Sequence, residues 1–398
     1  MLINIERLRE NIYELAKFSD TTKGITRISF TETYNNGINF VRKLMEDAGL
    51  TTKMDSVGNL IGRLESKNKD KKAIIIGSHI DTVPNGGMFD GTLGVLGGIE
   101  VIKILTENGY KNNHPLEVIS FINEEGTAHS LIGGTFGSRA MMGLLDINNI
   151  DFEENLKKVN LSEKDTNLGY RKPNTIKNYL ELHIEQGRKL YDEKVPIGIV
   201  TGIVGIWRFI ATVRGKSNHA GTTPMYARDD ALLKSLPLIQ GVNNVVNELD
   251  KNLVGTVGKI NVKPGAANVI PGEVELTIEI RGLEVEIVNK AINKIYELIK
   301  KIGDTELKQI EAKDPSLMDK NVQLQIEKAC QYKNINYKYL PSGAGHDARE
   351  VAKKASSGLI FIPSKDGLSH VPEEFTNFKY IQNGVNILLD TVKLLDIE

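Results

Sequence analysis

Four largely apolar runs mark the most buried strands that the sequence predicts, at 73–76, 116–122, 179–184 and 359–362. Runs of this kind are typical of strands buried on both faces, as in parallel sheets. Between the first two runs, Leu93 to Glu107 is rich in Val, Ile and Leu and is followed by Gly109, so we expect a helix there. The strand-helix-strand order predicts an α/β fold with a mainly parallel sheet.

The pattern changes between 207 and about 315. Strands are predicted at 207–214, 256–262, 274–281 and 306–312, and helices at 227–249 and 284–302. This βαββαβ order is the ferredoxin-like arrangement. The fourth apolar run comes only afterwards, so we expect a small domain at 207–316 inserted into a larger one built from 1–206 and 317–398.

Helical spacing is also found near both ends of the chain. We expect helices at 1–17, at 322–332 and at 377–395, and a helix after Thr31 that its side chain caps. Two short strands around Thr52 and Leu60 are expected to form a hairpin at a sheet edge.

Composition excludes several functions. The 398 residues include 50 basic and 51 acidic ones, a net charge of -1, so no basic excess favours nucleic acid as a partner. No apolar run is long enough to span a membrane, and the N-terminus resembles an amphipathic helix rather than a secretion signal. The single cysteine, Cys330, lies in a helical pattern. We therefore expect a soluble cytoplasmic protein without an internal disulfide.

Metal-ligand side chains lie near or after the end of each of the four apolar runs. In open α/β sheets, ligands bind beyond the carboxyl ends of the strands. Imidazoles and carboxylates suit zinc, manganese, cobalt or nickel, and we take zinc as the first choice. Two carboxylates that are able to bridge favour a two-metal hydrolytic centre. The predicted ligands are His79, Asp90, Glu125, His183 and His370.

Two further acids complete this predicted centre. His79 and Asp81 point the same way on an extended segment, so Asp81 can orient the imidazole. Glu124 and Glu125 could be a solvated acidic pair. However, adjacent residues at a strand end point in different directions, so Glu125 can hold a metal while Glu124 acts as the general base.

Other candidates stay open on the residues alone. His114 and His129 fit ordinary surface or core histidines. Arg281 is either an exposed charge or a guanidinium that binds a carboxylate through two hydrogen bonds. His219, in a loop after a strand, could face an oxyanion, and the 343–346 turn could offer backbone N–H groups, although glycine turns more often reverse the chain.

A series of motifs across nearly the whole chain resembles the amidase, hydantoinase and carbamoylase branch of the M20 metallopeptidase-like hydrolases. The most discriminating motif is His183-Ile184-Glu185-Gln186-Gly187. The others lie at 77–87, 89–91, 124–126, 137–140, 218–225, 267–272, 342–347 and 369–370.

The resemblance implies a two-metal catalytic domain split around a lid and dimerisation domain, and a homodimer in which the lid of one subunit helps complete the other's site. It matches His79, Asp90, Glu125, His183 and His370 to the metal ligands, with Asp90 bridging, and Glu124 to the base. The substrate-contacting positions that it implies are Gln186, His219, Asn268 and Arg281, with the turn at Gly345 and His346 as a further candidate.

The implied activity is hydrolysis of the carbamoyl or ureido C–N bond of a small carboxylate, such as an N-carbamoyl-L-amino acid or allantoate. The alternatives are an M20 peptidase or aminoacylase that cuts an ordinary amide, and a non-catalytic dimeric protein that binds small molecules. Relatives commonly carry Arg-Phe where this chain has Ala128-His129. We therefore expect a different substrate side chain.

Overall fold

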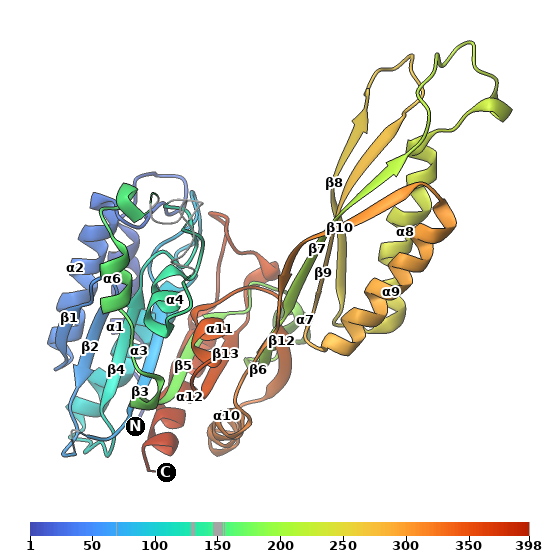
Figure 1. Ribbon diagram of the computed structural model, residues 1–398. Coiled ribbons are helices and arrows are strands. Elements are labelled where there is room, and N and C mark those ends of the chain that lie inside the picture. The colour runs from blue at the N-terminus through green and yellow to red at the C-terminus, as the bar shows by residue number, and fades with distance from the viewer. Residues whose placement is uncertain (69, 129–131, 146–153, 155, 398) are drawn as a thin grey trace. The chain divides into compact units, whose positions relative to one another are not determined.

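The computed structural model describes residues 1–68, 70–128, 132–145, 154 and 156–397. These form two compact units, Met1–Thr201 with Leu317–Glu398, and Gly202–Ser316 (Figure 1). Each unit has its own hydrophobic core. No helix among the described residues is both long and apolar enough to cross a membrane.

A nine-stranded mixed sheet forms the centre of the first unit, in the order β1-β2-β4-β3-β5-β13-β6-β11, with β12 paired to β6. Its four central strands, β4, β3, β5 and β13, are parallel, and the β1–β2 hairpin is antiparallel at one edge. The predicted fold class is confirmed. The strands are β1 (Thr51–Met54), β2 (Leu60–Leu64), β3 (Ala73–His79), β4 (Leu116–Phe121), β5 (Ile176–Ile184), β6 (Ile197–Ile203), β11 (Ser316–Leu317), β12 (Tyr337–Ser342) and β13 (Ser357–Ile362).

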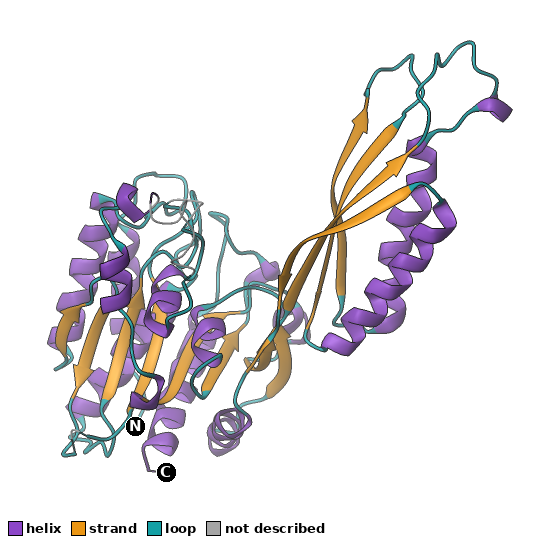
Figure 2. Ribbon diagram, viewed as in Figure 1, coloured by secondary structure: helices purple, strands orange, loops and turns teal. Residues whose placement is uncertain are grey.

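Helices cover both faces of this sheet (Figure 2). One group packs together on one face: α1 (Ile5–Ala16), α2 (Glu32–Asp47), α3 (Thr92–Glu107), α10 (Lys320–Tyr332) and α12 (Phe378–Ile397). Another group contains α4 (Phe136–Met142), α6 (Glu163–Leu168) and α11 (Asp347–Ala352). The remaining short elements are α7 (Lys189–Glu193), η1 (Pro173–Thr175) and η3 (Lys365–Gly367). Thr31 caps α2 as predicted, because its side chain accepts a hydrogen bond from Tyr34 N.

The parallel strands end at one edge of the sheet. His79 pairs with Phe121 at the ends of β3 and β4, and Ile184 pairs with Ile362 at the ends of β5 and β13. The segments that follow these strands therefore emerge side by side, which is the position where α/β sheets bind ligands.

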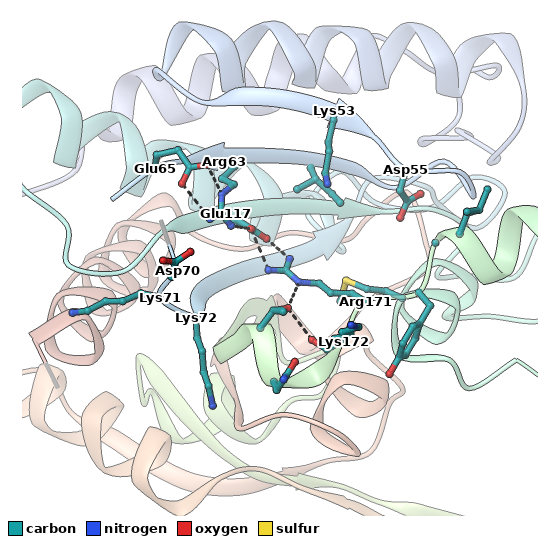
Figure 3. Close-up of a pocket in the computed structure, with 17 residues that line it drawn as sticks. Lys53, Asp55, Arg63, Glu65, Asp70, Lys71, Lys72, Glu117, Arg171 and Lys172 are labelled. Atoms are coloured by element: carbon teal, nitrogen blue, oxygen red, sulfur yellow. Dashed lines mark hydrogen bonds and ion pairs between the residues drawn. The ribbon is translucent and has the colours of Figure 1, made fainter. Parts of the chain in front are cut away.

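A buried acid pairs with two arginines next to the start of β5. Glu117 on β4 lies between Arg63 on β2 and Arg171, which comes just before β5, at the wall of a cavity of about 790 Å³ (Figure 3). Arg63 Nη1 lies 2.5 Å from Glu117 Oε1, and Arg171 also pairs with the Glu117 carboxylate. Because the Glu117 side chain is almost fully buried, both partners are needed to offset its desolvation. This triad links the β1–β2 edge to the strand that carries His183.

The second unit is a four-stranded antiparallel sheet in the order β10-β7-β9-β8. Helices α8 and α9 pack on it, and the inward-facing residues of β7 and β9 alternate with half-buried ones. The ferredoxin-like prediction is confirmed. The elements are β7 (Gly205–Arg214), η2 (Met225–Ala227), α8 (Ala231–Leu249), β8 (Val254–Lys263), β9 (Glu273–Gly282), α9 (Val285–Ile302) and β10 (Thr305–Lys313).

Candidate metal centre and active site

Asp90 presents one carboxylate oxygen to each of two groups of donors. Its Oδ1 lies 3.0 Å from His183 Nε2 and 3.8 Å from His79 Nε2. Its Oδ2 lies 3.1 Å from His370 Nε2, which is 3.4 Å from Glu125 Oε1. The five residues predicted as metal ligands therefore lie together as two clusters that share Asp90.

Backbone carbonyls set the tautomers of His79 and His183, the two buried histidines among the predicted ligands. His79 Nδ1 lies 3.0 Å from Asp81 O, and His183 Nδ1 lies 2.8 Å from Ile184 O. Because a carbonyl only accepts hydrogen bonds, each Nδ1 carries the proton and each Nε2 keeps its lone pair. Both Nε2 atoms face Asp90, as metal-binding nitrogens would.

Left-handed backbone conformations bring these residues together. Gly91 has a φ of +62°, and a Cβ there would lie 2.3 Å from His79 Nε2, so only glycine fits after Asp90. Asn123, Gln186 and His370 also have φ between 55° and 62°. Such conformations are costly for non-glycine residues and gather at functional sites.

The Asp81 carboxylate holds the Glu124–Glu125 turn. Its two oxygens accept hydrogen bonds from Glu124 N at 3.2 Å and from Glu125 N at 3.1 Å. We predicted that the Asp81 carboxylate orients His79. In the structure His79 Nδ1 is held by the Asp81 backbone oxygen instead, and Asp81 Oδ1 lies 3.8 Å from that nitrogen. Asp81 thus positions the predicted base and two predicted ligands together.

Glu124 lies beside the donor clusters. Its Oε2 is 3.7 Å from His79 Nε2, and the side chain is 10% exposed. Burial, followed by the charge of Glu125, raises the pKa of Glu124 well above its usual value. A carboxylate whose pKa is raised can take up a proton and later give it back, as a general base requires.

Three residues around Asp90 complete the first unit's site. Gln186 Nε2 donates to Asp90 Oδ2 at 2.8 Å, consistent with its predicted place at the site. Ser369 Oγ also donates to Asp90 Oδ2, at 2.9 Å, and lies 3.0 Å from Glu374 Oε2. Neither Ser369 nor Glu374 was predicted as a site residue. Ser369 lies in the 369–370 motif, and the signal for Glu374 was that it follows His370 by four residues.

The 343–346 turn lies next to this centre. The His346 imidazole is buried, with its ring 4.4 Å from that of His183 and its Nε2 3.0 Å from Ser342 Oγ. It therefore packs behind a predicted ligand. The substrate contacts expected of Gly345 and His346 stay predictions.

The predicted substrate residues of the second unit lie at two ends of its sheet. His219 follows β7 and forms a bridge with Val269, beside Asn268. Arg281 pairs with Ile206 at the opposite end of β9, and its Nε lies 2.7 Å from Glu279 Oε1. Eight residues (281 minus 273) separate Arg281 from the start of β9, roughly 27 Å at about 3.4 Å per residue. One copy of this unit therefore holds His219 and Arg281 far apart.

His219 is exposed and has a defined tautomer. Its Nδ1 accepts hydrogen bonds from Gly221 N at 3.0 Å and Thr222 N at 3.2 Å. The proton of a neutral ring therefore lies on Nε2, where it can be donated outward.

Other predicted residues take ordinary roles or fall outside the description. His114 Nδ1 lies 2.9 Å from Lys72 O near the surface, and Cys330 is buried in α10. His129 lies outside the described residues.

The residues present fit metal ions. Imidazole and carboxylate donors converge from separate segments, and Glu125 Oε1 is buried without a hydrogen-bond partner among the described residues. Buried carboxylates of this kind are normally paired or bound to metals. A mainly parallel sheet with such a donor set at its strand ends defines a class of hydrolases resembling metallopeptidases.

Comparison with known proteins identifies the family. The model of peptidase family M20/M25/M40 matches residues 75–394. An N-carbamoyl-L-amino acid amidohydrolase of Geobacillus stearothermophilus is 38% identical over 405 residues, covering 98% of each chain. A ureidoglycolate hydrolase of Arabidopsis thaliana is 35% identical over 413 residues, covering 98% of this chain and 86% of that one. A solved amidase of the hydantoinase/carbamoylase family from Burkholderia multivorans is 30% identical, with a TM-score of 0.89 and coverage of 100% and 99%.

The chain therefore belongs to the M20 family, in its hydantoinase/carbamoylase amidase branch, as the motifs predicted. It is an amidohydrolase that acts on C–N bonds.

Proposed function

We propose that this protein hydrolyses the carbamoyl or ureido C–N bond of a small carboxylate, such as an N-carbamoyl-L-amino acid or allantoate, and releases ammonia and carbon dioxide. The observation that carries the proposal is that the two Asp90 carboxylate oxygens face two separate donor clusters. Glu124 lies beside these clusters. The relatives named for N-carbamoyl-L-amino acids and ureidoglycolate support the ureido class.

Two divalent cations, zinc first, are the proposed cofactors. His79, His183 and Asp90 Oδ1 would hold one, and His370, Glu125 and Asp90 Oδ2 the other. When bound, such cations polarise a carbonyl and make water nucleophilic at neutral pH.

The chain's own residues supply the proton transfers and the orientation of the substrate. Glu124 takes the proton of the attacking water and passes it to the leaving nitrogen. His219 donates its Nε2–H to the developing oxyanion, and the Arg281 guanidinium binds the substrate carboxylate. Gln186 and Asn268 are proposed to contact the substrate.

The separation of His219 and Arg281 within one copy supports a dimeric site. We propose a homodimer through the 207–316 domain, in which His219 serves the partner's centre. The resemblance to the family implies the same arrangement.

Subunit mixing tests this arrangement. Glu124→Gln and His219→Ala proteins, each nearly inactive, are expected to regain about a quarter of wild-type activity after random reassociation, because half of the dimers are mixed and half of their sites are intact. Ammonia release after refolding the two proteins together measures it. If each His219 serves its own subunit, the mixture stays inactive.

A substrate panel tests the reaction itself. We expect the protein, supplied with defined metals, to release ammonia from N-carbamoyl-L-amino acids, allantoate or 3-ureidopropionate. Only ureido substrates yield ammonia from a carbamoyl group, so release of a free amine from ordinary amides would instead favour a peptidase or aminoacylase. Tight binding of a ligand without turnover across the panel would favour a non-catalytic binding protein.

A further inference from the structure

We propose that Glu374 is a positioning residue that locks the Asp90 segment to the His370 segment and thereby sets how the bridging carboxylate faces both donor clusters. The inference rests on the proposed metal-binding function. Glu374 touches none of the proposed ligand atoms and acts through the segments that carry them.

The two oxygens of Glu374 serve different segments. Oε1 accepts hydrogen bonds from Phe89 N at 3.0 Å and Asp90 N at 3.1 Å. Oε2 lies 3.0 Å from Ser369 Oγ, the hydroxyl that also reaches Asp90 Oδ2 at 2.9 Å. Glu374 therefore fixes the Asp90 backbone with one oxygen and the neighbour of His370 with the other.

The Glu374 side chain and its neighbour Phe375 pack closely against the loop that carries Asp90. A Cβ on Gly87 would lie 2.1 Å from the Glu374 carboxyl carbon, so glycine is needed at that position. Phe375 packs edge-on against Phe89, with ring centroids 6.0 Å apart. These two contacts hold the segment after His370 close to the Asp90 loop.

Burial argues that this glutamate has a specific role. Glu374 is 4% exposed, whereas its neighbour Glu373 is exposed. An acid is costly to bury unless hydrogen bonds or charges offset the loss of water. Here the backbone N–H groups of Phe89 and Asp90 do so, together with the Ser369 hydroxyl, whose one proton is shared between Glu374 Oε2 and Asp90 Oδ2. These groups belong to segments about 280 residues apart in the chain. Removal of a partner that orients a metal ligand commonly weakens metal binding by about 10- to 100-fold.

Metal titration of the apo-protein tests the proposal. Glu374→Ala is expected to weaken binding of at least one of the two Zn²⁺ ions by about 10- to 100-fold, measured by competition with a chromophoric chelator. Glu374→Gln keeps one oxygen for the two N–H groups and offers its NH₂ to Ser369 Oγ, so it should stay within about threefold of wild type. Glu373→Ala, the matched neighbour, should bind as wild type does.

Two further variants keep the test decisive if Glu374→Ala loses its circular-dichroism signal. Ser369→Ala cuts the link from Glu374 to the His370 segment together with the hydrogen bond from Ser369 to Asp90 Oδ2. Gly87→Ala displaces the Glu374 carboxylate without removing it. Both should weaken Zn²⁺ binding. Equal affinities in wild type and all these variants would overturn the inference and leave the proposed reaction untouched. A wild-type protein that binds Zn²⁺ yet releases no ammonia would remove the reaction, while weaker Zn²⁺ binding by Glu374→Ala would still support the positioning role.

Discussion

Replacing Glu124 with glutamine is expected to lower kcat by about 10²- to 10⁴-fold, the usual contribution of a general base, while metal content and folding stay intact. Glutamine has nearly the same shape and cannot take up the proton. Steady-state ammonia release together with metal analysis of the same sample measures both effects.

The adjacent residue provides the control. Glu125→Gln removes a proposed ligand from the cluster that contains His370, so it should lose metal as well as activity. Glu124→Gln should lose only activity. A Glu124→Gln protein with full metal content and a wild-type kcat would contradict the assigned role.

The Asp90→Asn substitution should have the largest effect on the centre, because it changes both clusters at once. An amide offers one neutral oxygen and directs an NH₂ group toward the other cluster, so it cannot hold two cations as a carboxylate does. We expect metal content after dialysis to fall from two ions per chain to one or none, and ammonia release to fall below detection.

A surface acid gives the comparison for Asp90. Asp192 pairs with Arg188 in solvent, so Asp192→Asn should retain full metal content and activity. Two tightly bound ions per chain in Asp90→Asn would show that Asp90 does not join the clusters.

Much of the fold followed from local patterns. The apolar runs located β3, β4, β5 and β13, because strands buried on both faces need continuous apolar residues. The start of α8 was placed four residues too early, since Asp230 caps the helix with hydrogen bonds to Leu232 N and Leu233 N. The strands β6 and β11, on the far side of β13, and the short helices α4 and α7 were not predicted, since short elements carry little periodicity.

The candidate site was predictable only where residues carry their own chemical signal. Histidines and acids after buried strands indicated the ligand set, because the sheet places those ends together. Glu374 carries no such signal, because the groups it binds at Phe89 and Asp90 lie far away in the chain. The separation of His219 from Arg281 depended on strand pairing, which local patterns do not reveal.

Anomalous diffraction from crystals of the zinc-loaded protein, recorded at the zinc absorption edge, tests the central claim most directly. The account predicts two peaks per chain, one between His79, His183 and Asp90 Oδ1 and the other between Glu125, His370 and Asp90 Oδ2. A single peak, or peaks that do not contact Asp90, would contradict it.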